Sequence, residues 1–193
     1  MRATFALAAL AFLAACATAP ASSPQQTFMA NLRALCGQAF EGRVVTTEAA
    51  DEAMLQERLV MHVRECSAND VRVPFHVGEN RSRTWVITQI PQGLRLKHDH
   101  RHEDGTSDTL TMYGGDSADA GSATRQEFPA DAESRALFVA NNIPQSVTNI
   151  WAIELTPGES FTYELSRPNR LLRATFDLTR PISAPPPPWG AED

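Results

Sequence analysis

From residue 40 onward, the chain is a succession of short runs rich in Val, Ile, Thr, Phe, Tyr and Trp, separated by Gly, Pro, Asn and Asp. The first group of residues favours strands and the second favours turns. Within the runs, apolar and polar side chains alternate as they do on a half-buried strand. The pattern predicts about ten strands, over residues 41–46, 59–65, 71–77, 84–90, 94–102, 109–113, 124–128, 149–155, 161–166 and 171–178.

Several neighbouring runs are joined by short turn sequences. Pro91-Gln92-Gly93 lies between two alternating runs, and so does Pro157-Gly158-Glu159. Such short links join antiparallel strands, because a parallel pair needs a crossover of a dozen residues or more. The sequence therefore predicts a mainly β domain built as an antiparallel meander. A meander of this length hides its edges by closing into a barrel or by splitting into a sandwich, and the pattern suits both.

Three segments do not have the strand pattern. Phe28, Leu32 and Leu35 recur at helical spacing, with Thr27 as the expected N-cap and Gly37 after the end, so we predict a short helix over residues 28–36. Residues 131–142 have helical propensity and an acidic start, which indicates a short helix before the last three strands. Residues 47–58 are predicted as a loop or a helical turn.

The first sixteen residues have the pattern of an export signal. Arg2 precedes an apolar run over residues 5–13 that is too short to span a bilayer, so residues 1–15 are predicted to be a cleaved signal peptide. Leu13-Ala14-Ala15-Cys16 resembles the lipobox of bacterial lipoproteins, which implies lipidation of Cys16 and anchoring in a membrane. By resemblance to Gram-negative sorting, Ala17 in place of Asp favours the outer membrane, with the domain facing the periplasm or the cell surface.

The remaining chain divides by composition into a tether, a domain and a tail. Residues 16–27 are predicted to be a lipidated flexible tether, and residues 28–182 form one domain large enough to bury its own core. The C-terminal segment, residues 183–193, contains four consecutive prolines, which favour polyproline II and cannot extend a sheet. This tail is either solvated, with Trp189 free to fold back onto the domain, or a ligand for a partner protein.

The chain contains three cysteines. If Cys16 is lipidated, Cys36 and Cys66 remain as a pair in an oxidising compartment, and we predict a disulfide between them. It would close a loop of about 30 residues and contribute about 3–4 kcal/mol in a chain-entropy estimate. The alternative is two buried free thiols.

Residues 96–108 (LKHDHRHEDGTSD) hold the densest group of candidate functional side chains. On a continuous strand, Leu94, Leu96, His98, His100 and His102 would share one face, so three imidazoles would line the barrel if the leucines point inward. They could bind a small ligand or, with ligands from other strands, a Zn²⁺ ion. A solvated strand end is the alternative. Further candidates on other segments are His62 and His76, and acidic residues such as Asp108 could fix the imidazole tautomers.

Other candidate residues flank this histidine segment. Tyr113 precedes two glycines, Gly114 and Gly115, which either let a loop approach a ligand closely or permit a turn with positive φ. Trp85 is placed in the core and also among the ligand-facing residues. Three further aromatic residues are predicted as core: Trp151, Phe161 and Phe176. Five arginines form either a carboxylate-binding patch or an ordinary ion-paired surface: Arg81, Arg83, Arg167, Arg170 and Arg173.

The order of the predicted elements resembles that of the calycin barrels, which include lipocalins, fatty-acid-binding proteins and nitrobindins. In this order a short helix comes first, Phe40-Glu41-Gly42 opens the first strand, and a meander follows. The resemblance implies a calycin-like β-barrel over residues 28–182. Gly42 is followed by Arg43 and Val44 instead of the lipocalin G-x-W, and no histidine follows His102 to match the haem ligand of nitrobindins. The chain also resembles a family of secreted proteobacterial proteins without an assigned activity. The resemblance lies in three segments: Arg83-Thr84-Trp85, residues 98–105 and Tyr113-Gly114-Gly115.

Composition and motifs narrow the function classes. The net charge of −6 and the absence of a basic cluster disfavour nucleic-acid binding, and the sequence has neither a G-x-S-x-G motif nor a glycine-rich phosphate loop. We therefore predict a lipid-anchored envelope protein whose barrel binds a small ligand without catalysis. One alternative is a metal-binding protein or metal-dependent enzyme that uses His98, His100 and His102. The other is a structural envelope protein that binds a protein partner.

Overall fold

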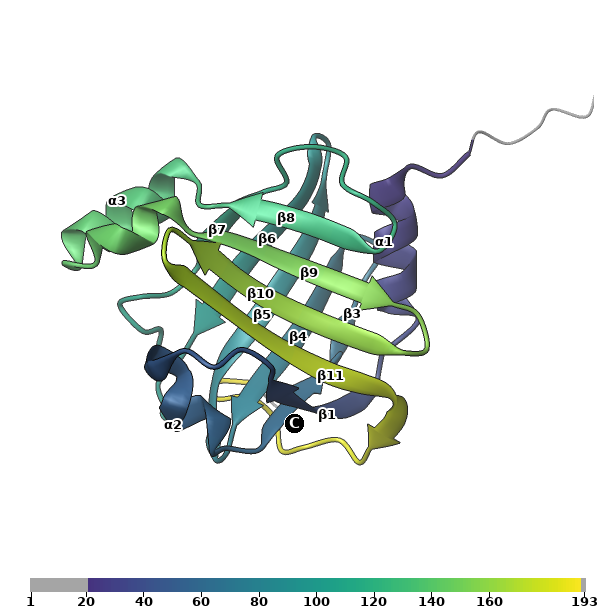
Figure 1. Cartoon of the computed structure of the whole chain (residues 1–193). Coiled ribbons are helices and arrows are strands. Elements are labelled where there is room, and N and C mark those ends of the chain that lie inside the picture. Colours follow the sequence, from purple (N-terminus) through teal and green to yellow (C-terminus); the bar gives the residue numbers. More distant parts are fainter. Residues whose placement is uncertain (1–20, 192–193) are drawn as a thin grey trace, which may run out of the picture.

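The computed structural model describes residues 21–191 (Figure 1). Across this range, ten strands are hydrogen-bonded in the order β7-β6-β5-β4-β2-β1-β11-β10-β9-β8, and every pairing is antiparallel. The short strand β3 pairs with β4 beside this path. The bounds are β1 Ala39–Val44, β2 Leu59–His62, β3 Glu65–Cys66, β4 Asp70–Val77, β5 Asn80–Ile90, β6 Gly93–His100, β7 Tyr113–Asp116, β8 Arg125–Pro129, β9 Ile150–Thr156, β10 Ser160–Arg167 and β11 Arg170–Ile182.

The sheet curls into a nearly closed barrel, in which β8–β11 face β4–β6 across the core (Figure 1). The prediction of a mainly β, antiparallel domain of about ten strands with a short N-terminal helix is confirmed. Of the barrel and the sandwich that the strand pattern allows, the chain forms a barrel. This barrel is compatible with a calycin-like fold. The last strand ends at Ile182.

The helices lie at the two ends of the barrel, with α1 at one end and α3 at the other (Figure 1). None of the helices within residues 21–191 has the length and apolarity that crossing a bilayer requires. The bounds are α1 Pro24–Arg33, η1 Ala49–Asp51, α2 Glu52–Leu55, α3 Ala132–Ala140 and η2 Pro144–Thr148.

The N-terminal helix begins earlier than its apolar spacing predicts. Ser23, not Thr27, is its N-cap: the Ser23 hydroxyl accepts from the amide of Gln26, while the Gln26 side chain accepts from the amide of Ser23. This capping box together with Pro24 at the first helical position starts the helix. Residues 24–27, predicted as part of the tether, are therefore helical. Cys16 and the predicted signal, residues 1–15, lie outside the described residues.

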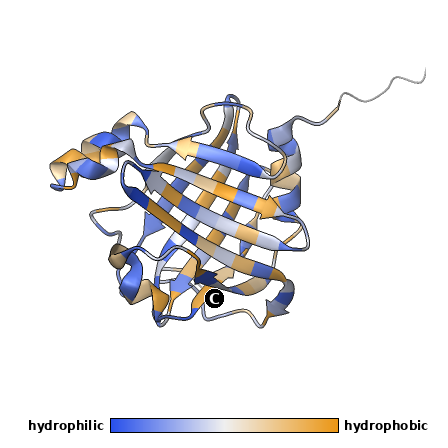
Figure 2. Cartoon of the chain, in the orientation of Figure 1, coloured by the Kyte–Doolittle hydropathy of each residue, from blue (hydrophilic) through white to orange (hydrophobic). Residues whose placement is uncertain are grey.

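The core follows the period-two alternation of the strands. On β10, Phe161 and Tyr163 are buried inside the barrel, whereas Glu164 points outward, and Figure 2 shows the same alternation of hydrophobic and hydrophilic positions on neighbouring strands. Trp85 lies at the centre of the core, stacked on Phe75 at 4.8 Å and on Tyr163 at 4.5 Å between ring centroids. The four predicted core aromatic residues are all buried: Trp85, Trp151, Phe161 and Phe176.

The barrel is sealed where β7 meets β8 without a strand pairing. Gly114 accepts a backbone hydrogen bond from Asp131 at 2.9 Å, and the Ser134 hydroxyl bonds both its amide and its carbonyl. A Cβ on Gly115 would lie 1.8 Å from the carbonyl oxygen of Pro129. The two glycines thus allow close approach, but to neighbouring backbone: Leu96 for Gly114 and Pro129 for Gly115.

A disulfide joins Cys36, just after α1, to Cys66 on β3, as predicted. It ties the helix at the end of the barrel to the edge of β4, with which β3 pairs. Because α1 contributes Phe28, Met29 and Leu32 to the core, this link holds apolar residues that close one end of the barrel.

The C-terminal tail is folded back onto the outer surface of β4–β6. Arg81 donates a side-chain hydrogen bond to the carbonyl of Pro187 at 2.7 Å, and the Trp189 amide donates to the carbonyl of Arg81 at 3.1 Å. Gly190 packs against Gly105 in the loop after β6. Of the alternatives for this segment, the structure shows Trp189 folded back onto the domain.

Candidate functional site

The pairing of β5 with β6 places His98 in the barrel interior. His98 lies opposite Trp85 in this register, and its side chain is 2% exposed. Its Nδ1 is 3.1 Å from the carbonyl oxygen of Tyr113, and its Nε2 is 2.8 Å from the hydroxyl of Tyr163. A carbonyl only accepts hydrogen bonds, so Nδ1 carries the proton and Nε2 accepts from the Tyr163 hydroxyl. Both ring nitrogens of a neutral imidazole are satisfied in this way.

The surroundings of His98 favour its neutral form. Burial is the main cause that lowers the pKa of His98 to about 3, and the neighbouring His100 lowers it further. Burial also raises the pKa of Tyr163 well above its usual value, so its hydroxyl stays protonated and able to donate. His98 is thus a polar element of the core that fixes how β6, β7 and β10 pack.

His100 lies one step further along the same inward face, at the mouth of the barrel. Its Nε2 is 3.1 Å from the hydroxyl of Tyr113, whose ring stacks on His98 at 4.7 Å. Burial lowers the pKa of His100 to about 4 and raises the pKa of Tyr113 to about 12, so both groups are neutral near pH 7. His100 and Tyr113 therefore present a hydrogen-bonded pair, not charges, at this end of the interior.

This pair borders a cavity of about 300 Å³ at the α3 end of the barrel. Aromatic and aliphatic side chains from β7, β9, β10, α3 and the loops form most of the wall, and a few polar groups converge on it. The lining residues are His100, Asp108, Leu110, Tyr113, Phe138, Ile143, Ser146, Asn149, Trp151, Tyr163, Leu165 and Arg167. The arrangement of an apolar wall with a small number of polar groups is that of a small-molecule site.

The third predicted histidine, His102, does not share this face. The strand β6 ends at His100, two residues before the predicted end, because the chain reverses: the amide of His102 bonds the carbonyl of Thr106, and Gly105 has a φ of +83°. His102 is exposed in this loop. The predicted strand over 109–113 is wrong for the same reason, since residues 109–112 complete the loop and β7 begins at Tyr113.

The other candidate metal ligands lie on the outside of the barrel. His76 alternates with the inward Phe75 and sits under Pro185 and Pro186 of the tail, and His62 lies on the outward face of β2. Within residues 21–191, no three His, Cys, Asp or Glu side chains gather as ligands of a metal ion would. The Zn²⁺ hypothesis for His98, His100 and His102 stays a prediction without a geometric argument in its favour.

Trp85 and Tyr113, the two predicted aromatic ligand contacts, differ in position. Tyr113 lines the cavity, whereas Trp85 is 1% exposed and lies deeper in the core, under Tyr163. Trp151 and Phe138 line the cavity in its place. The strand pattern predicts Trp151 as core and gives no indication of Phe138, because nothing in the sequence of helix α3 indicates which end of the barrel it covers.

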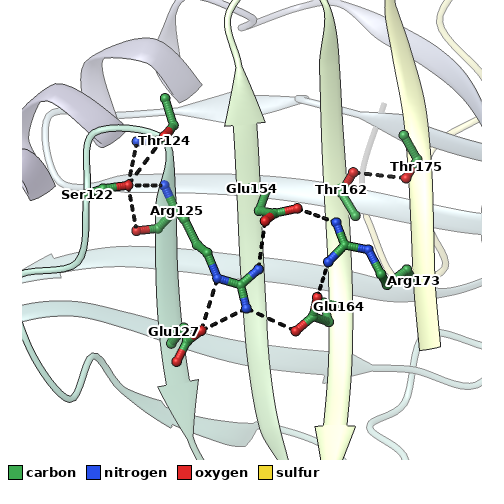
Figure 3. Close-up of polar contacts among 9 residues, drawn as sticks. All are labelled: Ser122, Thr124, Arg125, Glu127, Glu154, Thr162, Glu164, Arg173 and Thr175. Atoms are coloured by element: carbon green, nitrogen blue, oxygen red, sulfur yellow. Dashed lines mark hydrogen bonds and ion pairs between the residues drawn. The ribbon is translucent and has the colours of Figure 1, made fainter. Parts of the chain in front are cut away.

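The five clustered arginines do not form one patch. Arg173 belongs to an ion-pair network on the outer face of β8–β11, where Arg125 and Arg173 bridge Glu154 and Glu164 (Figure 3). Arg170 pairs with Glu48 and Asp51, and Arg81 binds the tail. Arg170 and Arg173 therefore have the predicted ion pairs, whereas the Arg81 side chain donates to a backbone carbonyl. Arg167 instead lines the cavity, and Arg83 lies opposite His100 in the strand register.

A larger hollow of about 440 Å³ lies on the outer surface beside the irregular pairing of β1 with β11. Four exposed charged residues line it, Glu41, Arg43, Glu159 and Asp177, together with Gly42, Ser160, Thr175 and Phe176. A Cβ on Gly42 would lie 2.5 Å from the ring of Phe176, so the two strands approach closely here. It has no convergent aromatic wall, and the smaller cavity at the mouth is the better candidate site.

Comparisons with known proteins returned no match: no protein-family profile, no curated protein and no solved structure is similar to the chain.

Proposed function

We propose that this protein is a small-ligand-binding β-barrel and that the cavity at the α3 end is its binding site. The observation that carries the proposal is the convergence of His100, Tyr113, Asn149 and Arg167 on a space walled by aromatic rings. The volume of about 300 Å³ is at the lower end of the range for small-molecule sites. The ligand is accordingly small, and its polar part meets a few fixed groups.

The role proposed is binding without turnover. The deeper histidine, His98, has both ring nitrogens engaged by the protein, and His100 is hydrogen-bonded to Tyr113. Such pairs hold donors and acceptors in fixed positions, which supports recognition of a ligand. The rigid aromatic stack beneath them supports a preformed site.

The cavity can be tested by filling it. Ser146 lines the cavity and Thr148 is exposed on the same short helix η2, so Ser146→Phe and Thr148→Phe are a matched pair. We expect fragment screening by ligand-observed NMR to find binders of wild-type 21–191 that Thr148→Phe retains and Ser146→Phe loses, with both variants folded by circular dichroism. A screen without binders, or binders that Ser146→Phe retains in full, would contradict the proposal.

We further propose that the barrel is anchored by lipidated Cys16 to the outer membrane, with the domain facing the periplasm or the cell surface. Support comes from the signal and lipobox pattern of residues 1–16 and from the Cys36–Cys66 disulfide, which suits an oxidising compartment. Radiolabelled palmitate should enter the full-length protein expressed in a Gram-negative host, and the label should fractionate with outer membranes. The variant Cys16→Ser should remain unlabelled; equal labelling of both proteins would contradict the proposal.

A further inference from the structure

Arg167 combines a place in the cavity wall with the lack of a carboxylate partner. It lies at the end of β10, lines the mouth cavity, and donates a hydrogen bond from Nη1 to the amide oxygen of Asn149 at 3.0 Å. Within residues 21–191, no carboxylate lies within ion-pair distance of its guanidinium. By contrast, Arg125, Arg170 and Arg173 each have two or more carboxylate partners.

A second cation lies nearby. Arg83 is paired across the strands with His100, and its one side-chain hydrogen bond among the described residues is donated to the amide oxygen of Asn80 at 3.1 Å. Burial is the main influence on the pKa of both His100 and Tyr113, and the charge of Arg83 lowers each of them. Arg83 is therefore close enough to contribute to the electrostatic potential of the cavity.

The cavity wall also contains a carboxylate. Asp108 is the one carboxylate in the cavity wall among residues 21–191, and its Oδ1 accepts a hydrogen bond from the amide of Leu110 at 3.0 Å. Within the lining, Arg167 and Asp108 carry opposite charges. From outside the lining, Arg83 adds positive potential, while Asp99, which also acts on His100, is already ion-paired with Arg72 and Arg101.

Aromatic rings line the same cavity as Arg167. Trp151 and Tyr163 line the cavity with Phe138 and Tyr113, and Tyr113 lies 5.7 Å from Trp151 between ring centroids. Beyond its one hydrogen bond to Asn149, the Arg167 guanidinium has N–H groups left to donate, and carboxylate is the acceptor that its planar geometry suits best. The surrounding rings require an apolar body attached to that acceptor.

We infer that the cavity binds a small organic monoanion, a carboxylate on an aromatic or aliphatic body, with the carboxylate on Arg167 and the body against the aromatic wall. The inference rests on the proposed function and specifies its ligand class. Arg167 is the charge-pairing residue, and Arg83 strengthens the attraction without touching the ligand.

Matched acid and amide probes separate charge from shape. 3-Phenylpropionate and 3-phenylpropanamide, together with hexanoate and hexanamide, can be titrated by calorimetry into wild type, Arg167→Gln and Arg180→Gln. Arg180 is the control, because its side chain is 85% exposed on β11. We expect each acid to bind wild type at least about tenfold more tightly than its amide, since a charge-assisted bidentate pair is about twice as strong as a neutral one. The preference should disappear in Arg167→Gln and persist in Arg180→Gln.

Three results would overturn the inference while leaving the proposed function intact. The first is equal affinity of acid and amide for wild type, and the second is a preference for the acid that survives in Arg167→Gln. The third is binding of fragments in the cavity without binding of either acid. A fragment screen without binders, or with binders that Ser146→Phe retains in full, removes both proposals, so the two failures are distinguishable.

Discussion

The hydroxyl of Tyr163 on β10 donates a hydrogen bond to Nε2 of His98 on β6 at 2.8 Å, across the interior of the barrel. The two residues are 65 positions apart in the chain, and both are buried. This bond links the two walls of the barrel directly beneath the cavity. It therefore couples the stability of the fold to the shape of the candidate site.

Removing the Tyr163 hydroxyl tests how much this hydrogen bond stabilises the fold. Tyr163→Phe leaves His98 Nε2 buried without a donor, and we expect the free energy of unfolding to fall by about 1–3 kcal/mol. Urea denaturation followed by tryptophan fluorescence measures it. The double variant Tyr163→Phe/His98→Phe, which removes both polar partners, should recover part of the loss. Wild-type stability in the single variant would show that the bond contributes nothing.

Stability should also fall as the pH falls from 6.5 toward 4. The pKa of His98 is lowered to about 3, and the pKa values of His76 and His100 to about 4, so unfolding in this window takes up protons that the folded state does not bind. Each such group lowers the free energy of unfolding by up to about 1.4 kcal/mol per pH unit.

The contribution of His98 can be isolated by difference. Unfolding free energies measured from pH 7 to pH 4 should decline less steeply in Tyr163→Phe/His98→Phe, by about the slope of one proton. A slope identical to that of wild type would mean that His98 does not titrate on unfolding.

The seam of the barrel should not tolerate a side chain at Gly115. A Cβ there would lie 1.8 Å from the carbonyl oxygen of Pro129, so Gly115→Ala must push β7 and β8 apart, and we expect a loss of about 3 kcal/mol or more. Gly158→Ala is the control, because its φ is +75° but no atom lies within 4 Å of the added Cβ. Backbone strain alone should cost about 1–2 kcal/mol there. Thermal melts that rank the control as the less stable variant would contradict this account of the seam.

Truncation after Ser183 should loosen the loop between β6 and β7. Gly190 contacts Gly105 and the side chain of Arg101, and the loop carries Asp108 and Leu110 into the cavity wall. Amide hydrogen exchange of residues 101–111 should accelerate by about tenfold or more in the truncated protein, while β9 and β10 stay protected. A truncation after Ala191 retains the contacts and should exchange as the full chain does. Unchanged exchange after removal of 184–193 would mean that the tail does not restrain the loop.

The sequence predicts most of the strands and turns because these depend on local chemistry. It predicts the cysteine pair because that depends on the number of cysteines. Alternation of side chains on a strand places His98 and Phe161 inward wherever the strand lies, and turn residues such as Gly158 mark where it must end. The three cysteines leave one pair once Cys16 is assigned to lipidation, and the Cys36–Cys66 disulfide is present in the structure.

The contacts that form the candidate site depend on tertiary structure. The run His98, His100, His102 predicts one face, but the turn at Gly105 removes His102 from the strand. Arg167 resembles Arg173 in the sequence, yet only Arg173 lies opposite carboxylates on the outer face, while Arg167 lines the cavity. Local sequence determines which way a side chain points from its strand. Which side chains from distant segments that side chain contacts is decided by closure of the barrel. Closure depends on the register of all ten strands together.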